Sequence, residues 1–534
     1  MRITDSSEES MPAKRPQAIS STEKEAQSII FPRDYNEWFP LRCDQVIFWL
    51  CKHLNGANAI NIAYRTNEKL DIKLLKKALT YTINKHPMCK VQFANFKMQQ
   101  RYVENVEADI ECIKLTPGIN EIEALKKYQI NLYTNNPINL NKAPLLKVKV
   151  LSSVDGNRDY IILCIAHIIS DFSSILIIYQ TLLDSYYNYL QKNDKNLTLP
   201  DYNEAYNHII LGKIQLNQEI AEMVNFWEKY TKNAPRLEFP LSIMSFKRSY
   251  KYDNMVAQHL PSEIISKLKE RCAQNNISLN MTFIALSGLL FACYSNTNTS
   301  YIYSAGSGRN NKTTQRVVGY LITFKLWGVP IVPKASLSEH LSNFLFEIKG
   351  SLKHQHAPAV IKGWAHYKNM CRLDEKNNFL TFQIIKRIKS WVNGNIEQAQ
   401  IEGIVGCYIQ HIVFSFKMFI ARTKGLIFKR ALNLKIPMAV VVNMPYGQDA
   451  EKNVLENVVF TQNGVAPLSL INRNQLYLYL FLDGAGGINA ALNGILSEDA
   501  KKKILHDLYY LIECLVKNPD TKVSEILEKI HGWD

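Results

Sequence analysis

Hydrophobic and polar positions follow two different periods along this chain. Short runs that alternate, such as residues 145–151, and short continuous runs of β-branched residues are typical of strands. Longer runs with apolar residues three and four positions apart, such as residues 70–83, are typical of helices. The two kinds follow one another, so the pattern predicts a layered α/β fold. Further strands are predicted at 60–66, 110–116, 256–260, 301–306 and 475–483, and further helices at 41–50, 261–278, 279–295, 336–357 and 498–518.

The most apolar stretch, residues 160–179, splits into two halves around a short polar segment. The first half predicts a buried strand, and the second predicts the buried start of a helix. His167 and Asp171 lie between them. An imidazole and a carboxylate at the end of a strand, with hydrophobic residues on both sides, can form a proton-transfer site that excludes water. The alternative is a hydrogen-bonded structural histidine followed by an aspartate that caps a helix.

The length of 534 residues is too great for one hydrophobic core, so two lobes are expected. A polar connector and a helix that contains Trp227 and Tyr230 suggest where the lobes are joined. Residues 371–435 mix aliphatic and aromatic residues with Lys and Arg. This composition is typical of an insertion that binds an anionic membrane or covers a lipid chain. The alternative is a core helix or a crossover between the lobes. The predicted organisation is a disordered tail at 1–30, an N-terminal lobe at 31–200, a linker helix at 201–240, and a C-terminal lobe at 241–534.

Composition and charge narrow the class of protein. An apolar fraction of 47% with 21% charged residues is that of a globular enzyme. The formal charge of +15 suggests anionic partners, among which nucleic acid is the least supported because finger spacings and RNA-binding motifs are missing from the sequence. The 10 cysteines form no CxxC pair and lie partly in apolar runs, as in a reduced cytoplasmic protein. Residues 1–28 are polar and resemble no signal peptide, so we expect a soluble or peripheral-membrane protein.

The segment from Ala166 to Ser174, AHIISDFSS, resembles the His-His-x-x-x-Asp-Gly signature of a large acyltransferase superfamily. The superfamily includes chloramphenicol acetyltransferase, the condensation domains of nonribosomal peptide synthetases, and wax ester synthases. The second His of the signature falls on His167 and the Asp on Asp171, while Ala166 replaces the first His and Phe172 replaces the Gly. The resemblance implies two chloramphenicol acetyltransferase-like lobes that form a V-shaped pseudo-dimer, with the active site between them.

Other segments resemble the same superfamily in the same order. Gln45 lies in a first helix like that of the family, and Arg309 follows a strand at the place where the family has an Arg that pairs with the signature Asp. Residues 317–331 resemble the family's Val-Gly-x-Phe-Val-Asn-Thr strand, with Gly319 matching and Thr323 in place of the Asn. A buried Arg and Asp pair suits this role, because the planar guanidinium binds a carboxylate at two points.

The resemblance implies acyl transfer without a covalent enzyme intermediate. The donor is expected to be a thioester of coenzyme A or of a phosphopantetheine arm on an acidic carrier protein, and the acceptor a small amine or alcohol. His167 is expected to take the acceptor's proton as general base, Asp171 to shape the loop through Arg309, and Ser174 or Thr323 to donate a hydrogen bond to the oxyanion. The sequence suggests no metal, no tightly bound cofactor and no nucleic-acid partner; His354 and His356 are two residues apart without a third ligand.

Two alternatives remain open on the sequence. The departures at Ala166 and Phe172 are also expected of a relative that keeps the fold, has lost catalysis and serves as a binding or scaffold module. The basic apolar insertion at 371–435 suggests a peripheral-membrane lipid acyltransferase of the wax ester synthase kind.

Overall fold

The fold is described from a computed structural model, and every structural statement below concerns the residues that it describes. Three predicted segments lie wholly or mostly outside these residues. They are the tail at 1–30, most of the linker helix at 201–240, and residues 372–432 of the insertion at 371–435. The described residues are 37–41, 45, 48–49, 59–134, 138–193, 197, 222–235, 237–240, 256–309, 314–357, 359–371, 433–436, 439–444, 455–459, 476–482, 486–494 and 496–530.

A five-stranded sheet forms the N-terminal lobe, in the strand order β14, β2, β7, β6, β5. Its middle strand β7 is buried along its whole length, as its run of Ile, Leu and Cys predicts, and it is antiparallel to both neighbours. The strands are β2 (Ala59–Thr66), β5 (Ile110–Lys114), β6 (Leu146–Ser152), β7 (Asp159–Ala166) and β14 (Leu455–Val459).

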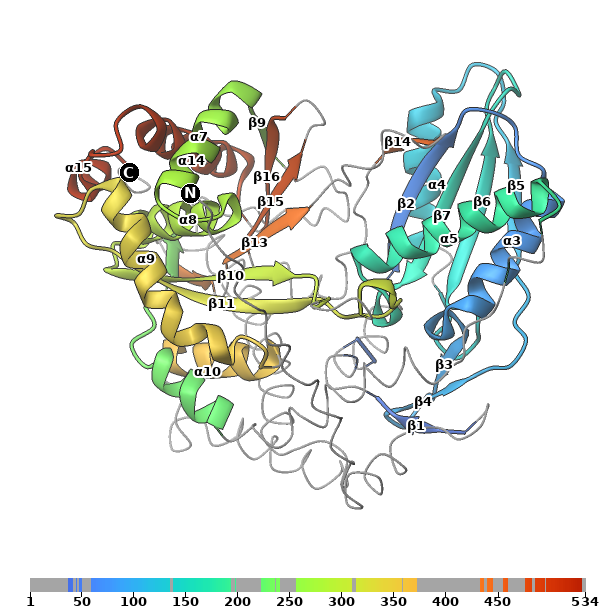
Figure 1. Cartoon of the computed structure of the whole chain (residues 1–534), viewed down its shortest axis with the longest axis horizontal. Coiled ribbons are helices and arrows are strands. Elements are labelled where there is room, and N and C mark those ends of the chain that lie inside the picture. The colour runs from blue at the N-terminus through green and yellow to red at the C-terminus, as the bar shows by residue number, and fades with distance from the viewer. Residues whose placement is uncertain are drawn as a thin grey trace, which may run out of the picture.

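Three helices cover this sheet. α3 (Ile72–Lys85) and α5 (Phe172–Leu190) pack against each other, and α5 crosses in front of the strands in Figure 1. α4 (Glu121–Thr134) joins β2 through Asn61, whose side-chain Nδ2 donates to the Gln129 carbonyl at 3.1 Å. A small sheet of β1 (Phe39–Pro40), β4 (Gln99–Tyr102) and β3 (Val91–Phe93) lies beside the lobe.

The C-terminal lobe contains a six-stranded sheet in the order β11, β10, β13, β15, β16, β9. One face of this sheet packs on α8, whose nearly uniform apolar sequence is explained by burial on most sides. The strands are β9 (Val256–Leu260), β10 (Thr299–Gly306), β11 (Thr323–Pro330), β13 (Ala439–Met444), β15 (Leu476–Leu482) and β16 (Ile488–Gly494). The helices are α7 (Ser262–Gln274), α8 (Leu279–Ser295), α9 (Leu337–Ser351), α10 (Ala359–Cys371), α14 (Glu498–Lys517) and α15 (Val523–Lys529), and β8 (Leu237–Pro240) pairs with β12 (Asn433–Ile436).

The two lobes are joined by segments that cross from one to the other (Figure 1). The loop between β10 and β11 leaves the C-terminal lobe and places Val318 and Tyr320 in the hydrophobic core of the N-terminal lobe. Strand β14, which comes late in the chain, pairs with β2 at the edge of the N-terminal sheet. The N-terminal lobe therefore receives part of its structure from the C-terminal half of the chain. The predicted boundaries at 200 and 241 stay predictions, because both fall among residues that the structure does not describe.

The predicted α/β class and its division into two lobes are confirmed, and most of the predicted elements are found within a few residues of their expected positions. Among the described helices, none is on its own long and apolar enough to cross a membrane, and α7 with α8, bent by 95°, is a pair that passes on length and composition. Strands β15 and β16 pair antiparallel.

Candidate active site

His167 lies where strand β7 ends, in a single 3₁₀ turn from His167 to Ile169. Its ring Nδ1 is 2.8 Å from the backbone carbonyl oxygen of Ser170. A carbonyl oxygen can only accept a hydrogen bond, so Nδ1 must carry the hydrogen. In the neutral ring this leaves the lone pair on Nε2, which is the nitrogen that can take a proton from another molecule.

The surroundings of His167 are apolar and aromatic. The ring is half-buried and lies 5.1 Å from the ring of Phe48 and 5.4 Å from that of Tyr320, measured between ring centres. Burial lowers the pKa of His167, while the hydrogen bond to Ser170 and the nearby charge of Asp171 act in the opposite direction. The net effect is a pKa below the ordinary value, so the imidazole is neutral near pH 7 and can act as a base.

Asp171 is the buried N-cap of α5 and is bound by Arg309 from the other lobe. Arg309 Nη1 donates to Asp171 Oδ2 at 2.7 Å, and Nη2 donates to Asp171 Oδ1 at 2.9 Å. The backbone N–H of Leu321 donates to Oδ2 at 2.9 Å, and that of Ser174 donates to Oδ1 at the same distance. The bidentate ion pair and the two backbone N–H groups give hydrogen bonds to both carboxylate oxygens, as a buried ion pair requires.

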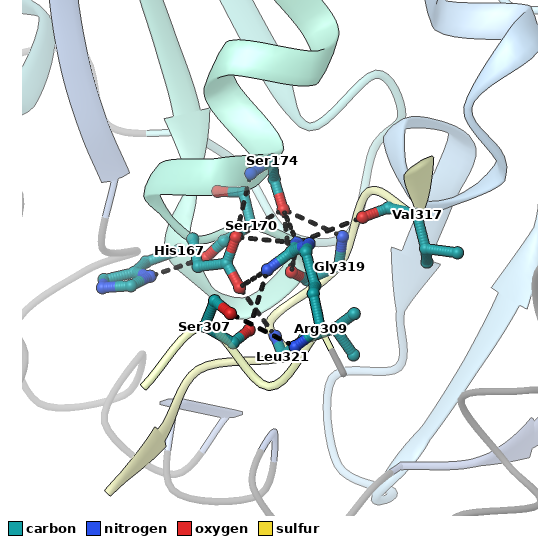
Figure 2. A network of polar contacts seen from close by, with 9 residues as sticks. His167, Ser170, Ser174, Ser307, Arg309, Val317, Gly319 and Leu321 are labelled. Carbon is teal, nitrogen blue, oxygen red and sulfur yellow. Dashed lines mark hydrogen bonds and ion pairs between the residues drawn. The ribbon is translucent and has the colours of Figure 1, made fainter. Parts of the chain in front are cut away.

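Ser174 belongs to the same network, which Figure 2 shows in close view. Its hydroxyl oxygen is 2.8 Å from both Asp171 Oδ1 and the carbonyl of Gly319, and it accepts from the Gly319 N–H at 3.0 Å and from Arg309 Nη2 at 2.9 Å. The one hydroxyl hydrogen is therefore shared between acceptors inside the network. These contacts give no support to the expected role of Ser174 in binding the oxyanion, which stays a prediction.

The remaining predicted residues lie around this network. Thr323 begins β11, opposite Gly306 on β10, and is half-buried without a hydrogen bond to His167 or Asp171. Gly308 has φ +66 and passes so close to Leu321 that a Cβ here would lie 1.8 Å from the Leu321 carbonyl oxygen. Glycine is therefore required just before Arg309 to bring the guanidinium to Asp171. The ring of His167 points away from Arg309 in Figure 2.

The two departures from the signature have different surroundings. Ala166 is completely buried at the end of β7, where its N–H donates to the Leu145 carbonyl at 3.0 Å. Phe172 is the first residue of α5, is half-buried, and packs against a hydrophobic cluster of the C-terminal lobe. The first replacement is thus accommodated inside the N-terminal lobe, whereas the second places an aromatic side chain between the lobes.

Gln45 and Gln100 support the turn that carries His167, a role that the sequence did not reveal. Both side chains are buried, and their amides bond to each other, with Gln100 Nε2 donating to Gln45 Oε1 at 2.9 Å. Gln45 Nε2 also lies 3.3 Å from the carbonyl of Ile168, the residue after His167. The resemblance of the first helix draws attention to Gln45, but nothing in the sequence connects it with Gln100.

Replacement of Gln45 by leucine is expected to destabilise the protein by about 1–3 kcal/mol, because the Ile168 carbonyl and the Gln100 amide lose a buried partner. Chemical unfolding measures this change. Gln180→Leu is the matched control, since Gln180 is exposed on α5 and should change stability by less than about 0.5 kcal/mol. Equal stability of the Gln45 and Gln180 variants would contradict the support that Gln45 is inferred to give.

No group of three metal-binding side chains is found among the residues that the structure describes. His354 is stacked on the ring of Phe226, with 3.9 Å between ring centres. The stacking on Phe226 therefore assigns His354 a structural role in packing.

Comparison with known proteins relates this arrangement to one family. A model of the Condensation domain family matches residues 48–361. Bacitracin synthase 3 of Bacillus licheniformis is 23% identical over 312 residues, which are 57% of this chain and 5% of that synthase. The match thus concerns a small part of a much longer relative.

Solved structures of the same kind match nearly the whole chain. The first condensation domain of the calcium-dependent antibiotic synthetase matches with a TM-score of 0.61 and 13% identity, over 92% of this chain and 99% of that one. The X-domain from teicoplanin biosynthesis, in its complex with OxyB, matches with a TM-score of 0.64 and 13% identity, over 93% of this chain and 97% of that one. At such identities the match shows the fold, and it confirms the expected pair of acyltransferase-like lobes.

Proposed function

This chain belongs to the Condensation domain family, and from that premise we propose that it transfers an acyl group from a thioester to an amine or hydroxyl acceptor, with His167 as general base. The family implies acyl or peptidyl transfer between carrier-bound thioesters. The donor proposed for this chain is an acyl thioester on a phosphopantetheine arm or on coenzyme A. The observation that carries the proposal is the contact between His167 Nδ1 and the Ser170 carbonyl, which leaves Nε2 as the basic nitrogen.

In the proposed reaction the acceptor's nitrogen or oxygen attacks the thioester carbonyl carbon. His167 Nε2 takes the proton that the attacking atom loses. The new bond to the carbonyl carbon forms, the carbon–sulfur bond breaks, and the leaving thiolate takes the proton back from His167. The buried aromatic surroundings of the imidazole keep it neutral before attack and limit access of water, which would otherwise hydrolyse the thioester.

Arg309 and Asp171 are proposed to be positioning residues. Asp171 follows Ser170, whose carbonyl holds the His167 ring, so the ion pair fixes the backbone on which the orientation of the imidazole depends. The ion pair also ties the two lobes together, since Asp171 caps α5 of the N-terminal lobe and Arg309 follows β10 of the C-terminal lobe. Neither side chain needs to touch substrate for this role.

An assay of the purified chain tests the proposal. Acyl-pantetheine and acyl-coenzyme A donors are offered to a panel of amines and alcohols, and the products are identified by mass spectrometry. We expect an amide or ester product to form faster with the protein than without it. Absence of product with every donor and acceptor would reject the proposal in favour of the module described below.

The pH dependence of the same reaction is a separate prediction. Because burial lowers the pKa of His167, the imidazole stays neutral to a lower pH than a free histidine with a pKa of about 6.5. We expect kcat/KM to rise tenfold per pH unit on the acidic side and to level off at a midpoint below pH 6.5. Rates measured between pH 4.5 and 8 provide the profile, and a midpoint above 6.5 would contradict the assignment of His167, whose pKa is lowered, as the base.

A second candidate function is a binding module without catalysis. The packing of Phe172 between the lobes favours it, since the ring occupies space next to the signature residues. The X-domain, which shares the fold, was solved as a complex with OxyB. If this candidate is correct, the purified chain should bind a carrier or enzyme partner and give no product in the assay above.

The third alternative is a peripheral lipid acyltransferase. It depends on the predicted insertion at 371–435, of which residues 372–432 lie outside the described part of the chain. Sedimentation with anionic vesicles, with and without this segment, tests it. Binding that needs the segment would favour the lipid acyltransferase, and absence of binding would remove it.

A further inference from the structure

Tyr320 comes from the C-terminal half of the chain, yet its ring lies against the proposed general base. It belongs to the segment between β10 and β11, and its side chain is only 8% exposed, inside the hydrophobic core of the N-terminal lobe. The centres of the Tyr320 and His167 rings are 5.4 Å apart, and the two ring planes meet at 69°. This is an edge-to-face arrangement, which is favourable between aromatic rings. The contact joins the imidazole directly to a segment that arrives from the other lobe.

A third ring completes a closed group around the imidazole. Phe48 lies 5.1 Å from His167 and 4.8 Å from Tyr320, measured between ring centres, so each of the three rings contacts the other two. His167 Nδ1 also bonds to the Ser170 carbonyl. One hydrogen bond fixes the direction of a single N–H, but it still allows the ring to tilt about that contact. Phe48 and Tyr320 therefore supply the restriction that the hydrogen bond lacks.

The backbone of Tyr320 is held on both sides by the N-terminal lobe. The Gly319 N–H donates to Ser174 Oγ at 3.0 Å, and the Leu321 N–H donates to Asp171 Oδ2 at 2.9 Å. Gly319, Leu321 and Ser174 are seen in this arrangement in Figure 2. The residues before and after Tyr320 are thus bound to the start of α5. A backbone movement that took the ring away from the imidazole would break both hydrogen bonds.

We infer that Tyr320 is a positioning residue for His167, and that its ring, together with that of Phe48, holds the imidazole in the orientation required of the base. The inference rests on the proposed function of His167. Tyr320 falls at the variable position of the family's Val-Gly-x-Phe-Val-Asn-Thr strand, so the resemblance gives it no role. The same ring contributes to the burial that lowers the pKa of His167, against the opposing effects of the Ser170 hydrogen bond and the Asp171 charge.

The test compares the chain with its Tyr320→Ala and Tyr320→Phe variants. Alanine removes the ring, whereas phenylalanine keeps the ring and removes only the hydroxyl. The control is Val318→Ala, because Val318 lies in the same segment and packs in the same core but offers no ring to the imidazole. The values of kcat and KM are measured in the acyl-transfer assay. NMR of histidine-labelled protein measures the titration midpoint of His167, whose signal is identified by its loss in His167→Ala, and this measurement needs no turnover.

Tyr320→Ala is expected to lower kcat at least about tenfold while KM changes less than about threefold, since a small misplacement of a catalytic group costs up to about 10²-fold in rate. Its NMR midpoint should rise toward about 6.5, because loss of the ring lets water reach the imidazole and weakens the effect of burial. Tyr320→Phe and Val318→Ala should keep kcat within about twofold of the original and leave the midpoint unchanged.

In active protein, kcat decides. A value for Tyr320→Ala within about twofold of the Val318→Ala control would overturn the inference, and so would an equal loss in Tyr320→Phe, because the hydroxyl and not the ring would then be responsible. If the unchanged chain gives no product with any donor and acceptor, the proposed function fails and the NMR midpoint alone decides. A midpoint raised in Tyr320→Ala and not in the control then supports the contact as the support of the ring, and an unchanged midpoint overturns it. If circular dichroism shows that Tyr320→Ala does not fold, Tyr320→Leu takes its place; leucine is smaller than tyrosine and has no ring, so the same directions are expected.

Discussion

Replacement of His167 by alanine is expected to lower kcat by about 10²- to 10⁴-fold, the range that a positioned general base contributes. The expected loss of rate depends on Nε2, the ring nitrogen that does not bond to Ser170. Since Nδ1 donates to the Ser170 carbonyl, Nε2 is the atom that takes the acceptor's proton, and alanine removes it. The measurement is the initial rate of product formation at saturating donor and acceptor.

The control for this prediction is His259→Ala. His259 is exposed on β9, far along the chain from the signature, and its ring contacts the side chain of Asn489. Its loss should leave the rate within about twofold of the original. A His167→Ala protein that retains the full rate would rule out this residue as the base.

The sequence predicted those parts of the site that depend on local order. The apolar run before His167 predicted β7, and the alternative interpretation of Asp171 as a helix cap predicted the start of α5; both elements form in this way. These features depend on residues a few positions apart, where the period of the pattern is informative. The partnership of Asp171 with Arg309 came from the resemblance, and the structure brings the two side chains together across 138 positions of sequence.

Other parts of the site could not be predicted, because they depend on contacts between distant segments. Nothing in the sequence pairs Gln45 with Gln100, or places the N–H of Leu321 on the Asp171 carboxylate. Tyr320 reads as one more aromatic residue in a strand-like run, yet it crosses to the other lobe and lies against His167. Strand β14 likewise joins a sheet whose other strands lie at least 289 positions earlier in the chain, since β7 ends at Ala166 and β14 begins at Leu455. Strand pairing of this kind is determined by tertiary packing, and it produces no periodic pattern of hydrophobic residues from which it could be predicted.

Replacement of Arg309 by methionine is expected to destabilise the protein by about 3–5 kcal/mol, as removal of one partner from a buried ion pair does. The side chains of Arg309 and Asp171 are each only 4% exposed, so the carboxylate would be left charged, buried and without its counter-ion. Two backbone N–H groups and the Ser174 hydroxyl would still face the carboxylate, but they do not carry a full charge. Chemical unfolding followed by circular dichroism gives the free energy of unfolding.

A second variant separates the charge of the pair from its shape. In the double variant Asp171→Asn with Arg309→Met no charge is left uncompensated, so the loss of stability should be smaller than the sum of the two single losses. The control is Lys267→Ala, which removes an exposed i,i+4 pair with Glu263 and should cost less than about 1 kcal/mol. Because the pair joins the two lobes, the Arg309 variant should also lose acyl transfer at denaturant concentrations where it is still folded. Additive losses in the double variant would show instead that the two side chains stabilise the protein independently, and Asp171 would then have to shape the His167 loop by capping α5 alone.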